Sequence, residues 1–287
     1  MKPDMIKGFD VYPFVNLFYN SHKAVREWPD RVTRARSLHH KAEYLTVVEG
    51  LRPCATIHLN PQDYDVQIER LTKDGLVWLP IQRTKKYSGF AHQHYPVQQM
   101  DMNSSVYGVL AKRLEDAEAF RKASNPAPGK ATDHETIGKL LGFPECCAKY
   151  FTEVFPKYVD PVFQSAERTS SAEWINDNEI KVKLLPETNQ MLRYAGFRLG
   201  SHFPCSLDCE GTKETAKIWI QAMEEIDKEG LKDMMDILSL PGKWSVMHGV
   251  AIVETEPFTV LANSMATKER WTVSWEVADE QRKKKRN

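Results

Sequence analysis

Four of the five cysteines of this chain lie in two short stretches, and in both a Phe-Pro pair precedes the first cysteine. The stretches are GFPECCAKYF (residues 142–151), with Cys146 and Cys147, and HFPCSLDCEGTKETA (residues 202–216), with Cys205 and Cys209. In a reducing compartment, clustered cysteines are more often metal ligands or redox centres than structural disulfides. The two stretches are therefore the first place to look for chemistry.

Helices are predicted to position these thiols. Proline suits the first position of a helix, so we expect helices to begin at Pro144 and Pro204. The free N–H groups and the positive dipole end of a helix N-terminus favour the thiolate, which binds metal or acts as a nucleophile. The second cysteine pair is four residues apart and would share one helix face. The first pair is adjacent, about 100° apart around a regular helix, so at least one of its members should face the second pair.

Four thiolates, or three with His202 as the remaining ligand, satisfy the tetrahedral demand of zinc or the four-cysteine requirement of an iron–sulfur cluster. The spacing matches neither the CxxC halves of a zinc ribbon nor the CxxxCxxC pattern associated with radical chemistry. Two other interpretations stay open. The cysteines could be inert core residues, as we expect for Cys54, or Cys205 and Cys209 could form a redox pair.

Three carboxylates beside the cysteines are candidates for proton transfer near a metal-bound water: Glu145, Asp208 and Glu210. Acidic residues in the first turn of a helix also complement the helix dipole without any catalytic role. The sequence leaves both interpretations open for each carboxylate.

The order of these motifs resembles that of an uncharacterised prokaryotic and phage protein family. Its members show Pro-x-Cys-Cys, then His-x-Pro-Cys-x-x-x-Cys, then a Trp-Ser-x-x-x-Gly-x-Ala strand, as in PECC, HFPCSLDC and WSVMHGVA of this chain. The match covers roughly residues 132–257. The resemblance implies that Cys146, Cys147, His202, Cys205 and Cys209 form one site. It also associates the chain with nucleobase modification, including phage deazaguanine pathways.

Composition excludes several classes of protein. Basic and acidic residues balance at 39 each, so the formal net charge is zero and a nucleic-acid contact would need a local patch. The contents of 41% hydrophobic and 27% charged residues are typical of a globular chain. The N-terminus lacks a signal-peptide pattern and no apolar run approaches the length that spans a bilayer, so we expect a cytoplasmic protein with no membrane partner.

The fold is predicted to be α+β. We expect a small N-terminal α/β unit over 1–123, a linker over 124–131, and a helical cysteine-motif domain over 132–287 that closes on an antiparallel sheet. Periodicity, caps and turn signals predict a helix over 32–48 with His39 and His40 at its surface, a hairpin over 64–82 around Gly75, a helix over 106–123, a helix capped by Thr132, and strands over 244–264 and 270–278.

Three functions fit these observations. The first is a metal-dependent enzyme with zinc or an iron–sulfur cluster, acting on a nucleobase, a nucleotide or another small molecule, with nucleic acid as a further candidate partner. The second is a binding or adaptor protein with a structural metal, and the third is a thiol oxidoreductase. Ligand number separates the first two for zinc, because a closed four-thiolate shell indicates structure and an open position indicates catalysis.

Overall fold

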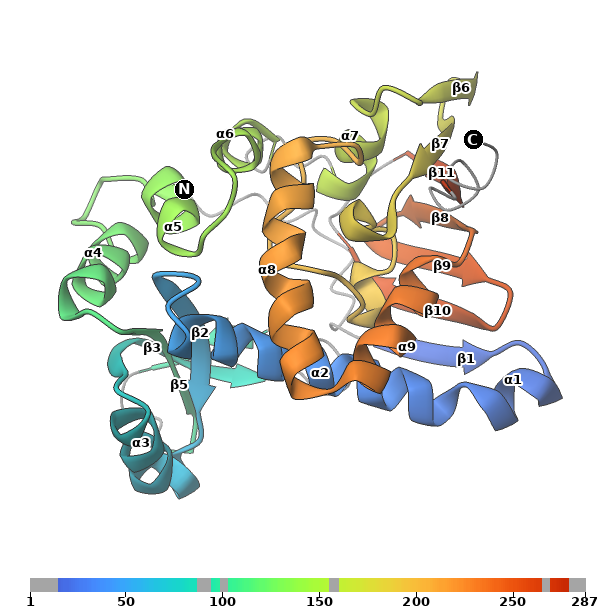
Figure 1. Cartoon of the computed structure of the whole chain (residues 1–287). Coiled ribbons are helices and arrows are strands. Elements are labelled where there is room, and N and C mark those ends of the chain that lie inside the picture. Colours follow the sequence, from blue (N-terminus) through green and yellow to red (C-terminus); the bar gives the residue numbers. More distant parts are fainter. Residues whose placement is uncertain (1–14, 87–93, 99–102, 155–159, 265–268, 279–287) are drawn as a thin grey trace, which may run out of the picture.

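The computed structural model describes residues 15–86, 94–98, 103–154, 160–264 and 269–278 and has the expected mixed α+β fold. Two sheets lie on either side of helix α8 (Glu210–Ile226), and helix α2 (Pro29–Val48) runs along the base of both (Figure 1). The cysteine stretches lie in the helical region between the sheets. The two sheets therefore share a helical middle layer that carries the candidate site.

The larger sheet contains seven of the described strands. Their spatial order is β1 (Val15–Tyr19), β10 (Phe258–Asn263), β9 (Val250–Thr255), β8 (Gly242–Met247), β11 (Trp271–Val277), β7 (Glu179–Leu184) and β6 (Glu173–Asn176). Neighbouring strands are antiparallel except β7 and β11, which are parallel. The predicted C-terminal strands are confirmed, and a two-residue turn with positive φ at His248 and Gly249 joins β8 to β9.

One strand of this sheet comes from the N-terminal part of the chain. β1 pairs with β10, with Val15 opposite Ala262 and Tyr19 opposite Phe258. Helix α2 also packs on α8 and on α9 (Lys228–Leu238). The N-terminal segment thus contributes to the same sheet and the same helical layer as the cysteine stretches. The division into domains at residues 123 and 132 stays a prediction.

The smaller sheet is antiparallel in the described part of the chain. Its order is β2 (Cys54–Leu59), β5 (Ser105–Ala111), β3 (Val77–Lys86) and β4 (His94–Pro96). The remaining helices are α1 (His22–Glu27), α3 (Tyr64–Lys73), α4 (Leu114–Ser124), α5 (His134–Leu140), α6 (Glu145–Val154) and α7 (Pro161–Glu167).

The expected hairpin at Gly75 is wrong, because the residues before that turn form helix α3. Tyr64, Ile68 and Leu71 recur at helical intervals, and Leu71 is buried in the apolar cluster below the smaller sheet. Gly75 has a φ of +72° and its N–H donates to the carbonyl of Thr72, so this glycine ends a helix. A glycine after a short apolar run is compatible with both structures, and packing decided between them.

Two further predicted elements have different bounds. The expected helix over 106–123 is right only in its second half, α4, because its first half forms β5, where β-branched and aromatic residues pair with β2 and β3. Helix α5 begins one residue later than expected. Its N-cap is Asp133, whose carboxylate accepts the N–H of Thr136 at 3.0 Å.

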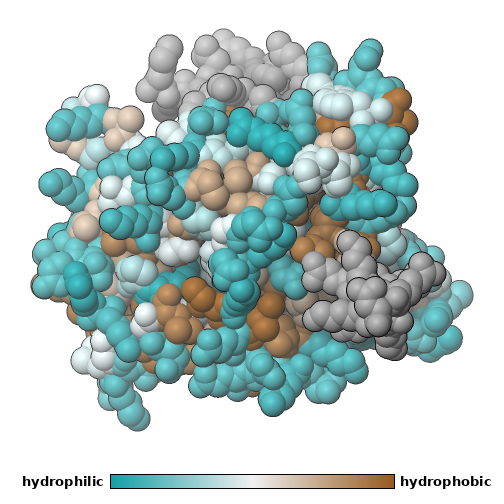
Figure 2. Space-filling view, turned by 45° about the horizontal axis from the view of Figure 1, so that its top comes forward, coloured by the Kyte–Doolittle hydropathy of each residue, from teal (hydrophilic) through white to brown (hydrophobic). Residues whose placement is uncertain are grey.

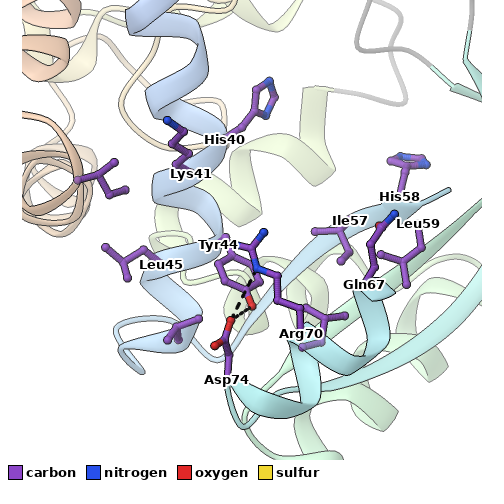
Figure 3. Close-up of a pocket in the computed structure, with 13 residues that line it drawn as sticks. His40, Lys41, Tyr44, Leu45, Ile57, His58, Leu59, Gln67, Arg70 and Asp74 are labelled. Carbon is purple, nitrogen blue, oxygen red and sulfur yellow. Dashed lines mark hydrogen bonds and ion pairs between the residues drawn. The ribbon is translucent and has the colours of Figure 1, made fainter. Parts of the chain in front are cut away.

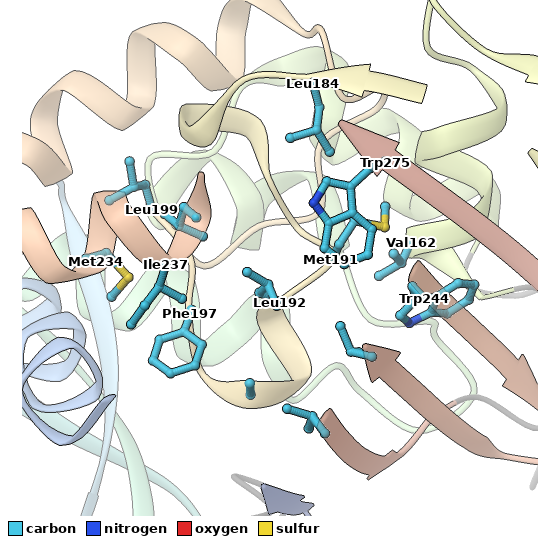
Figure 4. Close-up of a cluster of buried hydrophobic side chains, with 14 of the residues drawn as sticks. Val162, Leu184, Met191, Leu192, Phe197, Leu199, Met234, Ile237, Trp244 and Trp275 are labelled. Atoms are coloured by element: carbon cyan, nitrogen blue, oxygen red, sulfur yellow. The ribbon is translucent and has the colours of Figure 1, made fainter. Parts of the chain in front are cut away.

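The main core lies between the larger sheet and helices α2, α8 and α9. Figure 4 shows Trp244 and Trp275 of the sheet with Met191, Leu192 and Ile237 on the facing side. His39 belongs to this interior and not to the surface, as it is 1% exposed and stacks on Trp219 with ring centroids 5.0 Å apart. The predicted surface position of His39 is therefore wrong.

The outer face in Figure 2 is mostly hydrophilic, with smaller hydrophobic patches between the polar side chains. None of the helices in the described ranges is both long enough and apolar enough to cross a membrane.

The two buried tryptophans of the sheet provide a test of this core. We expect Trp244→Ala to lower the free energy of unfolding by about 3–5 kcal/mol, because it leaves a cavity. Trp244→Phe should cost much less, since within the described residues the indole N–H of Trp244 has no hydrogen-bond partner. Urea denaturation measures both changes.

The matched control is Trp275→Phe. The indole N–H of Trp275 donates to the carbonyl of Leu240 at 2.8 Å, so this change also removes a hydrogen bond, worth about 0.5–1.5 kcal/mol. Equal losses for Trp244→Phe and Trp275→Phe would contradict the assignment of these two environments.

Candidate metal centre

The four cysteines of the two stretches meet at one point. Their Sγ atoms all lie within 4.8 Å of one another. Cys146 and Cys147 are 3.8 Å apart at Sγ, and the sulfur of Cys209 lies 3.6 Å from each of them. All four are free thiols. Residues more than 60 positions apart in sequence thus form a cluster with the donor set of a metal site.

Helix α6 supplies the first pair from its first turn, and it lies beside the N-terminal end of α8 (Figure 1). Close approach of the two helices depends on Gly211. A Cβ atom at this position would come within 2.9 Å of Pro144 Cβ and 3.5 Å of Cys146 Sγ. The missing side chain therefore lets the start of α6 pack against the first turn of α8.

A loop, and not a helix, supplies the second pair, so the expected helix start at Pro204 is wrong. Helix α8 begins at Glu210, with Cys209 as its N-cap residue and Cys205 in the preceding loop. Hydrogen bonds from neighbouring segments hold this loop: Ser165 Oγ donates to the carbonyl of Pro204, and the N–H of Leu207 donates to Thr169 Oγ1 at 2.9 Å. The loop places both sulfurs at the cluster without the shared helix face that the spacing suggested.

The phenylalanines of the two Phe-Pro pairs pack reciprocally. Phe143 of the first stretch contacts His202 of the second, with ring centroids 5.4 Å apart. Phe203 of the second stretch stacks on Phe151 of the first at 6.1 Å, and the guanidinium of Arg193 lies 3.5 Å from the centroid of the Phe203 ring. Each stretch thus packs an aromatic residue against the other, which fixes how the two approach.

The cluster favours one thiolate, on Cys209. Hydrogen bonding from the thiol of Cys147 lowers the pKa of Cys209, and donors of Thr212 act in the same direction. The pKa of Cys147 is raised because its thiol donates to Cys209 and because it is buried, and burial also raises the pKa of Cys205. A divalent cation would displace the remaining thiol protons and use all four sulfurs.

The structure places His202 behind the cysteines. His202 Nε2 lies 3.0 Å from Thr212 Oγ1, which in turn lies 3.5 Å from Cys147 Sγ. A hydroxyl has one hydrogen, so if Thr212 donates to a Cys147 thiolate, its oxygen accepts the Nε2–H of His202. Burial, with the positive charge of Arg193, lowers the pKa of His202 to about 3, so the ring is neutral near pH 7. His202 is thus suited to orient Thr212 toward a ligand sulfur.

The three candidate carboxylates bond to other groups. Glu145 pairs with Lys149 at 2.5 Å and Glu210 pairs with Lys213 at 2.6 Å, both with largely exposed carboxylates. Asp208 accepts the N–H of Ser170 at 2.9 Å. These contacts fit dipole complementation and loop anchoring, and a proton-transfer role for the three residues stays a prediction.

Two residues of the site were not predicted from the sequence. Thr212 is buried against Cys147, and Gly211 permits the helix contact. A glycine and a threonine two and three residues after a cysteine N-cap are ordinary first-turn residues. Their role depends on the partner helix, which no local pattern reveals.

Searches of protein-family models, curated proteins and solved structures find no match to this chain. The family resemblance of the motifs therefore stays a prediction.

Gly211→Ala tests the helix contact directly. Helix propensity alone predicts a gain of about 1 kcal/mol from this change. We expect a loss of about 1–3 kcal/mol in the free energy of unfolding, because the new methyl group meets Pro144. Urea denaturation gives the sign, and Lys217→Ala at an exposed position of α8 is the control for alanine substitution. A stabilised Gly211→Ala variant would rule out the close approach.

Proposed function

We propose that this protein binds one Zn²⁺ ion through Cys146, Cys147, Cys205 and Cys209, and that the ion has a structural role. The observation that carries this proposal is the spacing of the sulfurs. A Zn–S distance of about 2.3 Å separates the sulfurs of a tetrahedral site by about 3.8 Å. The Sγ atoms of Cys146, Cys147 and Cys209 lie 3.6, 3.6 and 3.8 Å apart, which fits this separation, and the Sγ atom of Cys205 lies within 4.8 Å of all three.

The same spacing favours a single ion over an iron–sulfur cluster of four irons. In such a cluster each cysteine binds a different iron, so the sulfurs stand farther apart than around one shared ion. Tetrahedral sites with four thiolates are typical of zinc. A single iron atom in the same shell is the alternative that metal analysis distinguishes.

The number of ligands favours structure over catalysis. Four protein sulfurs complete a tetrahedral shell and leave no position for water or substrate, whereas catalytic zinc sites keep one position open. The ion would join the first turn of α6, the loop with Cys205 and the N-cap of α8. Such a link stabilises an arrangement that otherwise depends on a few loop hydrogen bonds and aromatic contacts.

The surroundings are suited to a negatively charged zinc–thiolate centre. Two helix N-termini, of α6 and α8, direct their positive ends toward the cluster. Thr212 supplies a neutral donor to Cys147, and His202 lies behind it. Enzymatic activity on nucleobases or nucleotides remains an expectation of the family resemblance. Redox cycling of Cys205 and Cys209 remains the competing use of the thiols.

Metal analysis tests the proposal. Protein purified without oxygen should contain about one zinc per chain and no visible chromophore. The double variant Cys205→Ser/Cys209→Ser should lose the zinc. The variant Cys54→Ala should retain it, because Cys54 is buried on β2 in an apolar cluster and is not one of the four clustered cysteines. Removing zinc with a chelator should lower the melting temperature of the wild type.

The competing functions give different results. If the purified protein contains iron and shows a visible absorption band, the site is an iron centre and not a zinc site. A metal-free protein that loses two thiols on mild oxidation would support the redox pair. An unchanged melting temperature after zinc removal would contradict the structural role.

The residue behind the cluster gives a graded test. We expect His202→Leu to weaken zinc binding by about 10–100-fold, the usual effect of removing an outer-shell partner. His202→Gln should retain more affinity, since its amide can donate to Thr212 in place of Nε2. Competition with a chromogenic zinc chelator measures both. Equal affinities for the wild type and His202→Leu would show that the contact with Thr212 does not support the ligands.

A further inference from the structure

A second candidate site lies away from the cysteines, where the smaller sheet meets α2. A cavity of about 680 Å³ opens between α2, β2 and α3, and Ile226 at the end of α8 also lines it. Pockets for small organic ligands commonly measure about 300–1,000 Å³. No cysteine lines the cavity, so its use is independent of the metal site.

One part of the lining is apolar. Leu45, Val48, Ile57, Leu59, Leu71 and Ile226 contribute aliphatic side chains from four different elements. Several of them belong to the apolar cluster below the smaller sheet, where Leu59 and Leu71 are buried. These side chains are held by the core on one side and face the cavity on the other. They form a preorganised surface for the apolar body of a ligand.

The polar part of the lining is mainly basic. Figure 3 shows His40 and Lys41 on α2 at one side, with His58 and Gln67 at the opposite side. His58 is held in place, since its Nδ1 lies 3.0 Å from Thr84 Oγ1. Lys41 is exposed at the edge of the cavity. Basic groups thus approach the cavity from both α2 and β2.

Asp74, the one acidic residue among the described residues of the lining, is already engaged. Asp74 accepts the hydroxyl hydrogen of Tyr44 at 2.5 Å, and the Nε atom of Arg70 lies 4.0 Å from it. The guanidinium of Arg70 lies 5.2 Å from the centroid of the Tyr44 ring. In Figure 3 these three residues lie together between α2 and α3. The opposite charges of Asp74 and Arg70 offset each other, so Lys41 contributes the remaining formal charge of the described lining residues.

We propose that this cavity binds a small organic anion with an apolar or aromatic body. The apolar body packs against the aliphatic lining between α2 and β2. The anionic group lies near Lys41 on α2, where it meets a positive charge, and the carboxylate of Asp74 among the described lining residues is engaged with Tyr44. A neutral ligand of the same shape gains only the apolar contacts.

Two fluorescent probes of similar size test the charge preference. 8-Anilino-1-naphthalenesulfonate carries an anionic group on an aromatic body, and N-phenyl-1-naphthylamine is its neutral analogue. In titrations of the protein, we expect one molecule of the sulfonate probe to bind saturably per chain. Lys41→Glu should lower the affinity for the anionic probe by about tenfold and the affinity for the neutral probe much less, because the reversed charge acts only on the sulfonate.

The control for the charge change is Lys73→Glu, at an exposed position of α3 that does not line the cavity. Lys73→Glu should leave the affinities for both probes unchanged. If Lys41→Glu and Lys73→Glu lower the affinity for the anionic probe equally, the proposed site is wrong, because the effect then depends only on the net charge of the protein. Equal weakening of both probes by Lys41→Glu would overturn the assigned ligand class.

A filling variant tests the location. Gln67→Trp places an indole in the cavity and should lower the affinities for both probes. Val66→Trp, at a position 71% exposed on the same helix, should leave both affinities unchanged. If Gln67→Trp binds both probes like the wild type, or if no probe binds saturably, the proposal is wrong.

Discussion

The approach of four sulfur atoms to within 4.8 Å is the constraint on which the middle of this structure depends. It requires the first turn of one helix, a loop and the N-cap of a second helix to meet, although the residues involved are more than 60 positions apart. Gly211 removes the side chain that would separate the two helices, and the reciprocal contacts of Phe143 and Phe203 fix their relative position. A metal ion in this cluster would link elements that each sheet alone could not hold together.

The loop before α8 connects this cluster to the larger sheet. Ser165 and Thr169, from α7 and the turn that follows it, bond to the backbone of Pro204 and Leu207, and Thr188 donates to the carbonyl of Leu207. Helix α7 in turn packs on β7 and β11. Because these bonds are made by buried hydroxyl groups to backbone atoms, loss of one leaves a buried polar group unpaired. The position of Cys205 is therefore set by the packing around the sheet as well as by its own sequence.

Helix α2 joins the two halves of the fold and creates the second candidate site. Near its N-terminus, Arg31 and Arg34 both pair with Asp233 of α9, each at 2.7 Å. Near its C-terminus, Tyr44 and Val48 pack against the cluster of the smaller sheet. The cavity lies beside the C-terminal half of α2. Here the helix contacts both the main core and the core of the smaller sheet, and the side chains of the two cores leave a space between them. Ligand pockets are common at such junctions between packed units.

Local patterns in the sequence predicted the grouping of the cysteine stretches, the helix over 32–48 and the C-terminal strands. These predictions succeeded because capping, periodicity and turn chemistry act over a few residues. The same patterns misplaced the start of α8 and the structure of residues 64–73. Tertiary structure decided these cases: hydrogen bonds from Ser165 and Thr169 hold residues 204–207 as a loop, and burial of Leu71 selects a helix. It also decided the roles of Thr212 and His202, since which side chains stand behind a ligand depends on contacts between distant segments that no short stretch of sequence contains.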